Sequence, residues 1–166
     1  TVNWFDELLD DYTLNSRFNF SLSGGGKIAR YYLASTVNTD NGNLKVDPRN
    51  NFNSNINFKR VSLRSNINVN LTKSTTVALK FNGNFDDYNG PLDGGAEVYQ
   101  KAMKANPVLY PKFYEPDAQF QNSNHILFGN AGQFGDYLNP YADLMRGYKD
   151  ESYNNFLATV EIKQDL

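Results

Sequence analysis

Hydrophobic and polar residues alternate strictly through residues 61–71. The odd positions carry Val61, Leu63, Ser65, Ile67, Val69 and Leu71, and the even positions carry Ser62, Arg64, Asn66, Asn68 and Asn70. A two-residue period is that of a β-strand with one apolar and one polar face. A polar break at residues 72–75 precedes a second alternating run at residues 77–85. The pattern therefore predicts a long β-hairpin with a tight turn.

The length of these strands narrows the class of protein. An eleven-residue strand spans about 36 Å, and a 45° tilt projects it to about 25 Å, close to the apolar band of an outer-membrane barrel. The Asn-rich polar face, with one arginine and one lysine, suits a water-filled lumen. Soluble β-sandwiches also alternate, so the pattern by itself leaves both architectures open.

Three further segments, residues 14–23, 29–38 and 153–166, repeat the alternation. Residues 24–27 read Gly-Gly-Gly-Lys between the first two segments, and the glycines supply the positive φ angles that a tight hairpin needs. A phosphate-binding loop is the competing interpretation. The required GxxxxGK[ST] spacing is missing and a strand follows instead of a helix, so we predict a turn.

The connections between the predicted strands alternate in length. They are short at residues 24–27, long at 39–59, short at 72–75 and long at 90–152. Outer-membrane barrels have short turns on the periplasmic side and long loops outside. We therefore expect five consecutive antiparallel strands with both short turns at one rim, and a long exposed loop at residues 39–59.

The long segments contain a few helical patterns. Residues 1–12 predict a short helical turn whose carboxylates form a solvated face, residues 97–105 a helix that stops before Pro107, and residues 142–145 another short helix. Prolines at 107, 111 and 116 predict an extended path between them. His125, the only histidine, is expected to be a loop residue.

Composition excludes several functions. The net charge is −2 and no run of Lys or Arg exists, which argues against a nucleic-acid partner. The absence of cysteine excludes disulfides, thiolate metal sites and a cysteine nucleophile. No apolar run is long enough for a transmembrane helix. With one histidine and no carboxylate pair in a strand context, we expect no catalytic residues, no metal site, no cofactor and no enzymatic activity.

Six blocks of the sequence occur in an order that resembles a known family. They are NWFDELL, LSGGGKIARYYLAS, NFKRVSLRSNINVNLTKSTTVALKFNGN, ANPVLYP, NPYADLMRGY and NNFLATVEIKQDL. Together they cover nearly the whole chain, and their order is similar to that of the SusC/RagA family of TonB-dependent outer-membrane transporters. The SGG…RYY block and the block around residues 60–72 are the most specific.

The resemblance implies a fold and a location. Residues 1–166 would be a partial β-barrel domain from the early part of a 22-stranded barrel: an all-β, antiparallel, up-and-down transmembrane segment with long extracellular loops that contain short helices. The plug domain, its TonB-contacting motif and the remaining strands would come from elsewhere in a larger protein, because a five-stranded sheet leaves two edges that cannot stand unpaired in hydrocarbon. The implied location is the cell outer membrane.

The resemblance also implies partners. Family members import oligosaccharides or peptides, take energy from TonB through the plug, and work with a SusD-like surface lipoprotein that closes over the barrel as a lid. Outer-membrane lipid would surround the wall.

The candidate substrate-binding residues line the expected lumen or mouth. They are Arg64, Asn66, Asn68, Lys80, Asn82, Asn84, Asp86, Asp87, Tyr88, Tyr110 and Tyr114. Hydration of the lumen and contact with the plug are the alternative roles of the polar residues, and packing among the loops is the alternative role of the tyrosines. The alternative function for the whole chain is a soluble all-β carbohydrate-binding module with aromatic loops.

Overall fold

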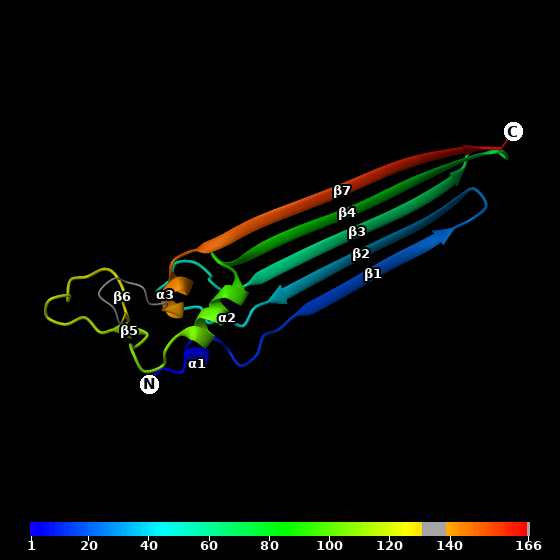
Figure 1. Ribbon diagram of the computed structural model, residues 1–166. Coiled ribbons are helices and arrows are strands. Elements are labelled where there is room, and N and C mark those ends of the chain that lie inside the picture. The colour runs from blue at the N-terminus through cyan, green and yellow to red at the C-terminus, as the bar shows by residue number, and fades with distance from the viewer. Residues whose placement is uncertain (131–138, 166) are drawn as a thin grey trace. The chain divides into compact units, whose positions relative to one another are not determined.

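The computed structural model describes residues 1–130 and 139–165, and its chain divides into two compact units (Figure 1). We call Leu14–Asp40, Asn57–Tyr88 and Glu151–Leu166 the sheet unit, although Leu166, the predicted end of the last strand, lies outside the described residues. We call Thr1–Thr13, Asn41–Ile56 and Asn89–Asp150 the helical unit. Each unit draws on three separate stretches of the chain.

Five strands form the main antiparallel sheet, as the alternating segments predicted. They are β1 (Ser16–Gly25), β2 (Ala29–Asn41), β3 (Asn57–Asn70), β4 (Thr75–Pro91) and β7 (Tyr148–Gln164), and they lie in the order β1-β2-β3-β4-β7. In the β1–β2 pair, Ser16 lies opposite Thr39 and Gly25 opposite Arg30. The sheet is open, with β1 and β7 as its outer strands.

The strands run beyond the alternating segments at the end with the long connections. β3 begins four residues before Val61, and β4 continues to Pro91. Polar cross-strand pairs hold this extension: Arg60 Nε and Nη2 donate to the two carboxylate oxygens of Asp86 at 2.7 and 2.6 Å. Backbone hydrogen bonds between neighbouring strands form whatever the side chains are. Strand pairing therefore continues beyond the residues that alternate.

Both short turns lie at one rim of the sheet, which confirms the expectation from the connection lengths (Figure 1). Residues 26–28 join β1 to β2, and residues 71–74 join β3 to β4. The Asn70 backbone N–H donates to the Ile28 carbonyl at 2.7 Å, and its side-chain Nδ2 donates to the Lys27 carbonyl at 2.9 Å. The Asp165 N–H donates to the Ser74 carbonyl at 2.8 Å, so the end of β7 lies at the same rim.

The two faces of the sheet differ in chemistry. On one face polar side chains pair across strands: Ser62 Oγ with Asn84 Oδ1 at 2.8 Å, and Thr36 Oγ1 with Asn19 Oδ1 at 2.9 Å. On the other face, aromatic and aliphatic side chains surround a groove of about 440 Å³ that includes residues of all five strands. Phe81 stacks on Phe156 there, with ring centroids 6.1 Å apart.

Large apolar side chains of the second face remain exposed. Phe18 is 65% exposed and Ile162 is 70% exposed, far more than such residues are in a packed core. The alternation that the sequence shows is therefore present in space, but nothing in residues 1–130 or 139–165 covers the apolar side.

The helical unit has a small hydrophobic core of its own. Its elements are α1 (Trp4–Leu8), α2 (Gly95–Lys104), α3 (Pro140–Met145) and a two-stranded sheet of β5 (Phe113–Tyr114) and β6 (Leu127–Phe128). The core residues are Trp4, Leu8, Leu44, Val98, Ala102, Ala105, Tyr110, Tyr141 and Leu144. The three predicted helices are confirmed. None of the helices in the described part of the chain has the length and hydrophobicity of a transmembrane helix.

The expectation of a long exposed loop at residues 39–59 is wrong for its central part. Leu44 lies in the core, pairs with Leu9 in an antiparallel bridge, and donates its N–H to Asn55 Oδ1 at 3.0 Å. Asn55 Nδ2 in turn donates to the Gly42 carbonyl at 2.9 Å. An isolated leucine among asparagines gives no periodicity, so its burial depends on contacts distant in sequence.

Candidate functional site

Six of the candidate residues share the polar face of the sheet unit. Arg64, Asn82 and Asn84 line one depression of about 360 Å³, together with Tyr32, Thr36 and Ser62. Lys80, on the same face, forms an exposed ion pair with Glu161 of β7 at 2.8 Å. Asn66 and Asn68 follow Arg64 along β3 at alternate positions, which places them on this face as well. This face offers amide and guanidinium groups to water.

Three further candidates lie near the end of β4. Asp86 accepts both hydrogen bonds from Arg60, and Tyr88, two residues on, is half-buried. Asp87 accepts a hydrogen bond from Ser152 Oγ at 2.7 Å. Because alternate strand positions point to opposite faces, Asp87 points away from the face that carries Asp86 and Tyr88.

The last two candidates belong to the helical unit. Tyr110 is 4% exposed and packs against Trp4, with ring centroids 5.6 Å apart. Burial raises the pKa of the Tyr110 hydroxyl. Its position is that of a core residue. Tyr114, in β5, is half exposed and lines a cavity of about 650 Å³.

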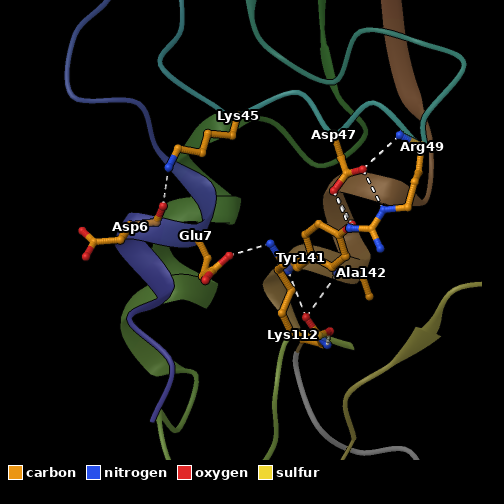
Figure 2. Close-up of polar contacts among 9 residues, drawn as sticks. Asp6, Glu7, Lys45, Asp47, Arg49, Lys112, Tyr141 and Ala142 are labelled. Carbon is orange, nitrogen blue, oxygen red and sulfur yellow. Dashed lines mark hydrogen bonds and ion pairs between the residues drawn. The ribbon is translucent and has the colours of Figure 1, made fainter. Parts of the chain in front are cut away.

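A polar cluster that the sequence did not indicate surrounds Asp47 in the helical unit. Figure 2 shows the Asp47 carboxylate between Arg49 and Tyr141. Arg49 Nε and Nη2 donate to its two oxygens at 2.9 and 2.8 Å, and the Tyr141 hydroxyl donates to Oδ2 at 2.6 Å. The Arg49 guanidinium holds the pKa of Asp47 well below its usual range. Burial, with the Asp47 carboxylate, raises the pKa of Tyr141.

Packing and capping position the members of this cluster. The Arg49 guanidinium stacks on Phe113, with Cζ 4.2 Å from the ring centroid. Asn139 caps α3, and its Oδ1 accepts hydrogen bonds from the N–H groups of Tyr141 and Ala142 at 3.0 and 3.2 Å. This cap fixes the start of the helix that carries Tyr141.

A second ion pair lies beside the first (Figure 2). Lys112 Nζ pairs with the Glu7 carboxylate of α1 and lies 5.0 Å from the centroid of the Tyr141 ring. Lys45 Nζ donates to the Asp6 carbonyl. Glu7 is therefore half-buried and paired, while the other carboxylates of the first twelve residues are exposed, as the solvated-face interpretation expected.

The 650 Å³ cavity adjoins this cluster. Its polar lining includes Arg49, Asn50, Glu115 and His125, and its rings are Phe113, Tyr114 and Phe128. The Asn50 Nδ2 group is buried and finds no acceptor within the described residues. The volume and the mixture of rings with a few polar groups are those of a small-molecule site.

The Asp47 carboxylate is not available as a general base. Asp47 is fully occupied by Arg49 and Tyr141, and a carboxylate held in this way is a poor base. Across residues 1–130 and 139–165, no three His, Asp or Glu side chains come together in a way that would hold a metal ion.

The sequence could not indicate this cluster because its parts are far apart. Asp47 and Arg49 lie in a polar turn, Lys112 and Phe113 lie in a proline-rich stretch, and Tyr141 opens a short helix. The Asn139-Pro140-Tyr141 sequence was the one local signal, as a helix start, and it says nothing of a partner at Asp47.

No protein-family model matches the chain, and no curated protein or solved structure matches it. The class that the fold and the site define is a long-stranded antiparallel sheet with one exposed apolar face and one polar face, together with a helical unit that contains a partly buried ion-pair cluster.

Proposed function

We propose that the chain is part of an outer-membrane nutrient importer of the TonB-dependent, SusC-like class. In this proposal the sheet unit is a segment of the barrel wall, and the long connections contribute to the extracellular mouth. The observation that carries it is the single-layered sheet whose apolar face is exposed along its strands. Exposing apolar surface to water costs about 25 cal/mol of free energy for each Å². Contact with hydrocarbon carries no such cost.

The dimensions support the same assignment. The alternating run of residues 61–71, nearly all of it in β3, would cross about 25 Å when tilted as barrel strands are. In hydrocarbon, the outer edges of β1 and β7 need hydrogen-bonding partners. The proposal therefore requires further strands that close the barrel.

The polar face would then line the lumen. Arg64, Asn82 and Asn84, gathered in one depression, are the first candidates for contact with cargo, which would be an oligosaccharide or a peptide. A SusD-like lipoprotein would cover the mouth, and TonB would supply energy through a plug domain.

A soluble carbohydrate-binding module is the second candidate. The observation that favours it is the 650 Å³ cavity with its aromatic rings and polar groups. A soluble module would have to cover the apolar face of the sheet with protein. Extraction distinguishes the two candidate functions, because a segment of a barrel wall needs detergent to leave the membrane fraction and a soluble module does not.

Thiol labelling in intact cells tests the importer proposal. The chain has no cysteine, so Asn51→Cys in a long connection and Lys73→Cys in a short turn each place one thiol at an exposed position. We expect a membrane-impermeant maleimide to label Asn51→Cys and leave Lys73→Cys unlabelled, because the two positions would lie on opposite sides of the outer membrane. Both variants should react after the cells are lysed in detergent, which serves as the control.

Equal labelling of the two thiols in intact cells would contradict the topology. Recovery of the chain in the aqueous fraction without detergent would contradict the membrane location itself.

A further inference from the structure

Four exposed cations gather at the rim of the sheet unit that carries the short turns. Lys27 and Lys73 lie in the two turns, Arg30 is the second residue of β2, and Lys163 lies near the end of β7. We call these four residues the basic rim. Asp165 is the one carboxylate among the described residues of this rim, and it pairs with Lys163 at 3.6 Å.

Three of these cations have no ion-pair partner in the part of the chain that the structure describes. Lys27, Arg30 and Lys73 form no ion pair within residues 1–130 and 139–165. Glu161, the next carboxylate along β7, is already paired with Lys80. The nearby carboxylates are therefore too few to neutralise these cations, and the rim carries a net positive charge.

The opposite end of the same strands is different. It carries five carboxylates and four cations: Asp40, Asp86, Asp87, Asp150 and Glu151 with Arg17, Lys59, Arg60 and Lys149. Arg60 and Asp86 neutralise each other. Of the two ends of the sheet, only the short-turn rim therefore carries an excess of positive charge.

Apolar side chains accompany the cations in both short turns. Ile28, next to Lys27, is 73% exposed, and Leu71, two residues before Lys73, is 62% exposed. The Tyr31 ring covers Gly24 so closely that a Cβ there would come within 2.7 Å of its hydroxyl oxygen. Apolar residues, a tyrosine and cations at one level are typical of the boundary between hydrocarbon and lipid headgroups.

We propose that Lys27 and Lys73, the turn residues of the basic rim, bind the phosphate groups of anionic phospholipids in the leaflet that faces the short turns. Arg30 and Lys163 lie on the polar face of their strands and would point to the lumen. The inference rests on the proposed function, since it needs the sheet in a membrane, and it adds the lipid class and the residues that select it. Charge complementarity carries it: each exposed cation near an anionic surface contributes about 1 kcal/mol, and a zwitterionic headgroup has no net charge to attract it.

Lipids that leave the membrane with the protein test the inference. Membranes from cells that make the protein are dissolved with a styrene–maleic acid copolymer, which keeps a ring of native lipid around each protein. Mass spectrometry then compares the ratio of phosphatidylglycerol to phosphatidylethanolamine in the purified discs with that in the whole membrane. We expect about twofold or greater enrichment of the anionic lipid for the unmodified chain.

Three variants assign the enrichment to the turn lysines. The double variant K27Q/K73Q should lose the enrichment. The double variant K59Q/K104Q removes the same charge elsewhere and should keep it. The charge-conserving K27R/K73R should also keep it, because both cations remain.

The outcomes separate this inference from the function on which it rests. An unmodified chain that is found in membranes without enrichment overturns the lipid site and leaves the importer proposal intact, as does equal enrichment in all variants. A chain that never enters membranes overturns both. Loss of a co-purified acidic protein in K27Q/K73Q, with an unchanged lipid ratio, would assign the turn lysines to a protein partner and overturn the lipid site.

Discussion

Asp47 joins three segments of the helical unit through one carboxylate. Arg49 lies two residues away, but Tyr141 comes from α3, and Phe113, which the Arg49 guanidinium stacks against, comes from β5. Hydrogen bonds to a charged group contribute about 1.5–3 kcal/mol, more than neutral ones. Removing the charge would leave Arg49 and Tyr141 with weaker partners in a partly buried setting.

Asp47→Asn should lower the free energy of unfolding of the helical unit by about 1.5–3 kcal/mol. Denaturant titration measured by tryptophan fluorescence reports on this unit alone, because Trp4 is the only tryptophan and lies in its core. Glu115→Gln, at an exposed carboxylate, is the control and should change stability by less than about 0.5 kcal/mol. Equal effects of the two substitutions would contradict the role of Asp47.

The stability of the unmodified chain and that of Asp47→Asn should respond differently to acid. The pKa of Asp47 is lowered in the folded state by Arg49, whereas an unfolded aspartate titrates near about 3.9. Its contribution is therefore complete at neutral pH and is lost as the pH falls below about 4. Titrations at pH 7, 5, 4 and 3 should show the difference between the unmodified chain and Asp47→Asn shrinking only at the acid end. A difference that stays constant to pH 3 would show that the charge is not the cause.

At the level of the element, the two faces of β3 differ in chemistry. Its side chains alternate between an apolar face and a polar face, and neighbouring positions therefore have opposite environments. A substitution that is harmful at one residue should be tolerated at the next, if the apolar face meets hydrocarbon and the polar face meets water.

Ile67→Arg and Asn68→Arg test this contrast with matched chemistry. Arginine at Ile67 should cost about 2–4 kcal/mol if this position faces lipid near the middle of the bilayer. Arginine at Asn68 should cost less than about 1 kcal/mol, because water would solvate it. Refolding titrations into lipid vesicles measure both. Comparable losses at the two positions would reject the assignment of the faces.

The elements also show where local pattern ends. The alternating runs located all five strands of the main sheet and the glycine run located its first turn, because side-chain period and turn chemistry are local properties. The strand extensions past residues 38 and 85 depend on polar cross-strand pairs such as Arg60–Asp86. Such pairs have no sequence period, so the alternating segments end before the strands do.

At the scale of the whole molecule, each unit is assembled from stretches that lie far apart in the chain. The helical unit collects the first thirteen residues, the connection from β2 to β3, and the connection from β4 to β7. Its core needs all three, since Leu8, Leu44 and Val98 come from different stretches. The long connections that the loop lengths marked as exceptional therefore form one packed structure.

Short-range order in this chain follows from its residues alone: the two-residue period sets the strands and their faces, and glycine and proline set the turns and helix ends. Contacts over long sequence separations were decided only by folding. Leu44 became a core residue, Asp47 met Tyr141, and Lys27, Arg30 and Lys73 were left at one rim with no ion-pair partner in the described part of the chain. The physical reason is the range of each effect. Backbone geometry acts between neighbours along the chain, whereas burial and charge pairing act between whichever groups the fold brings together.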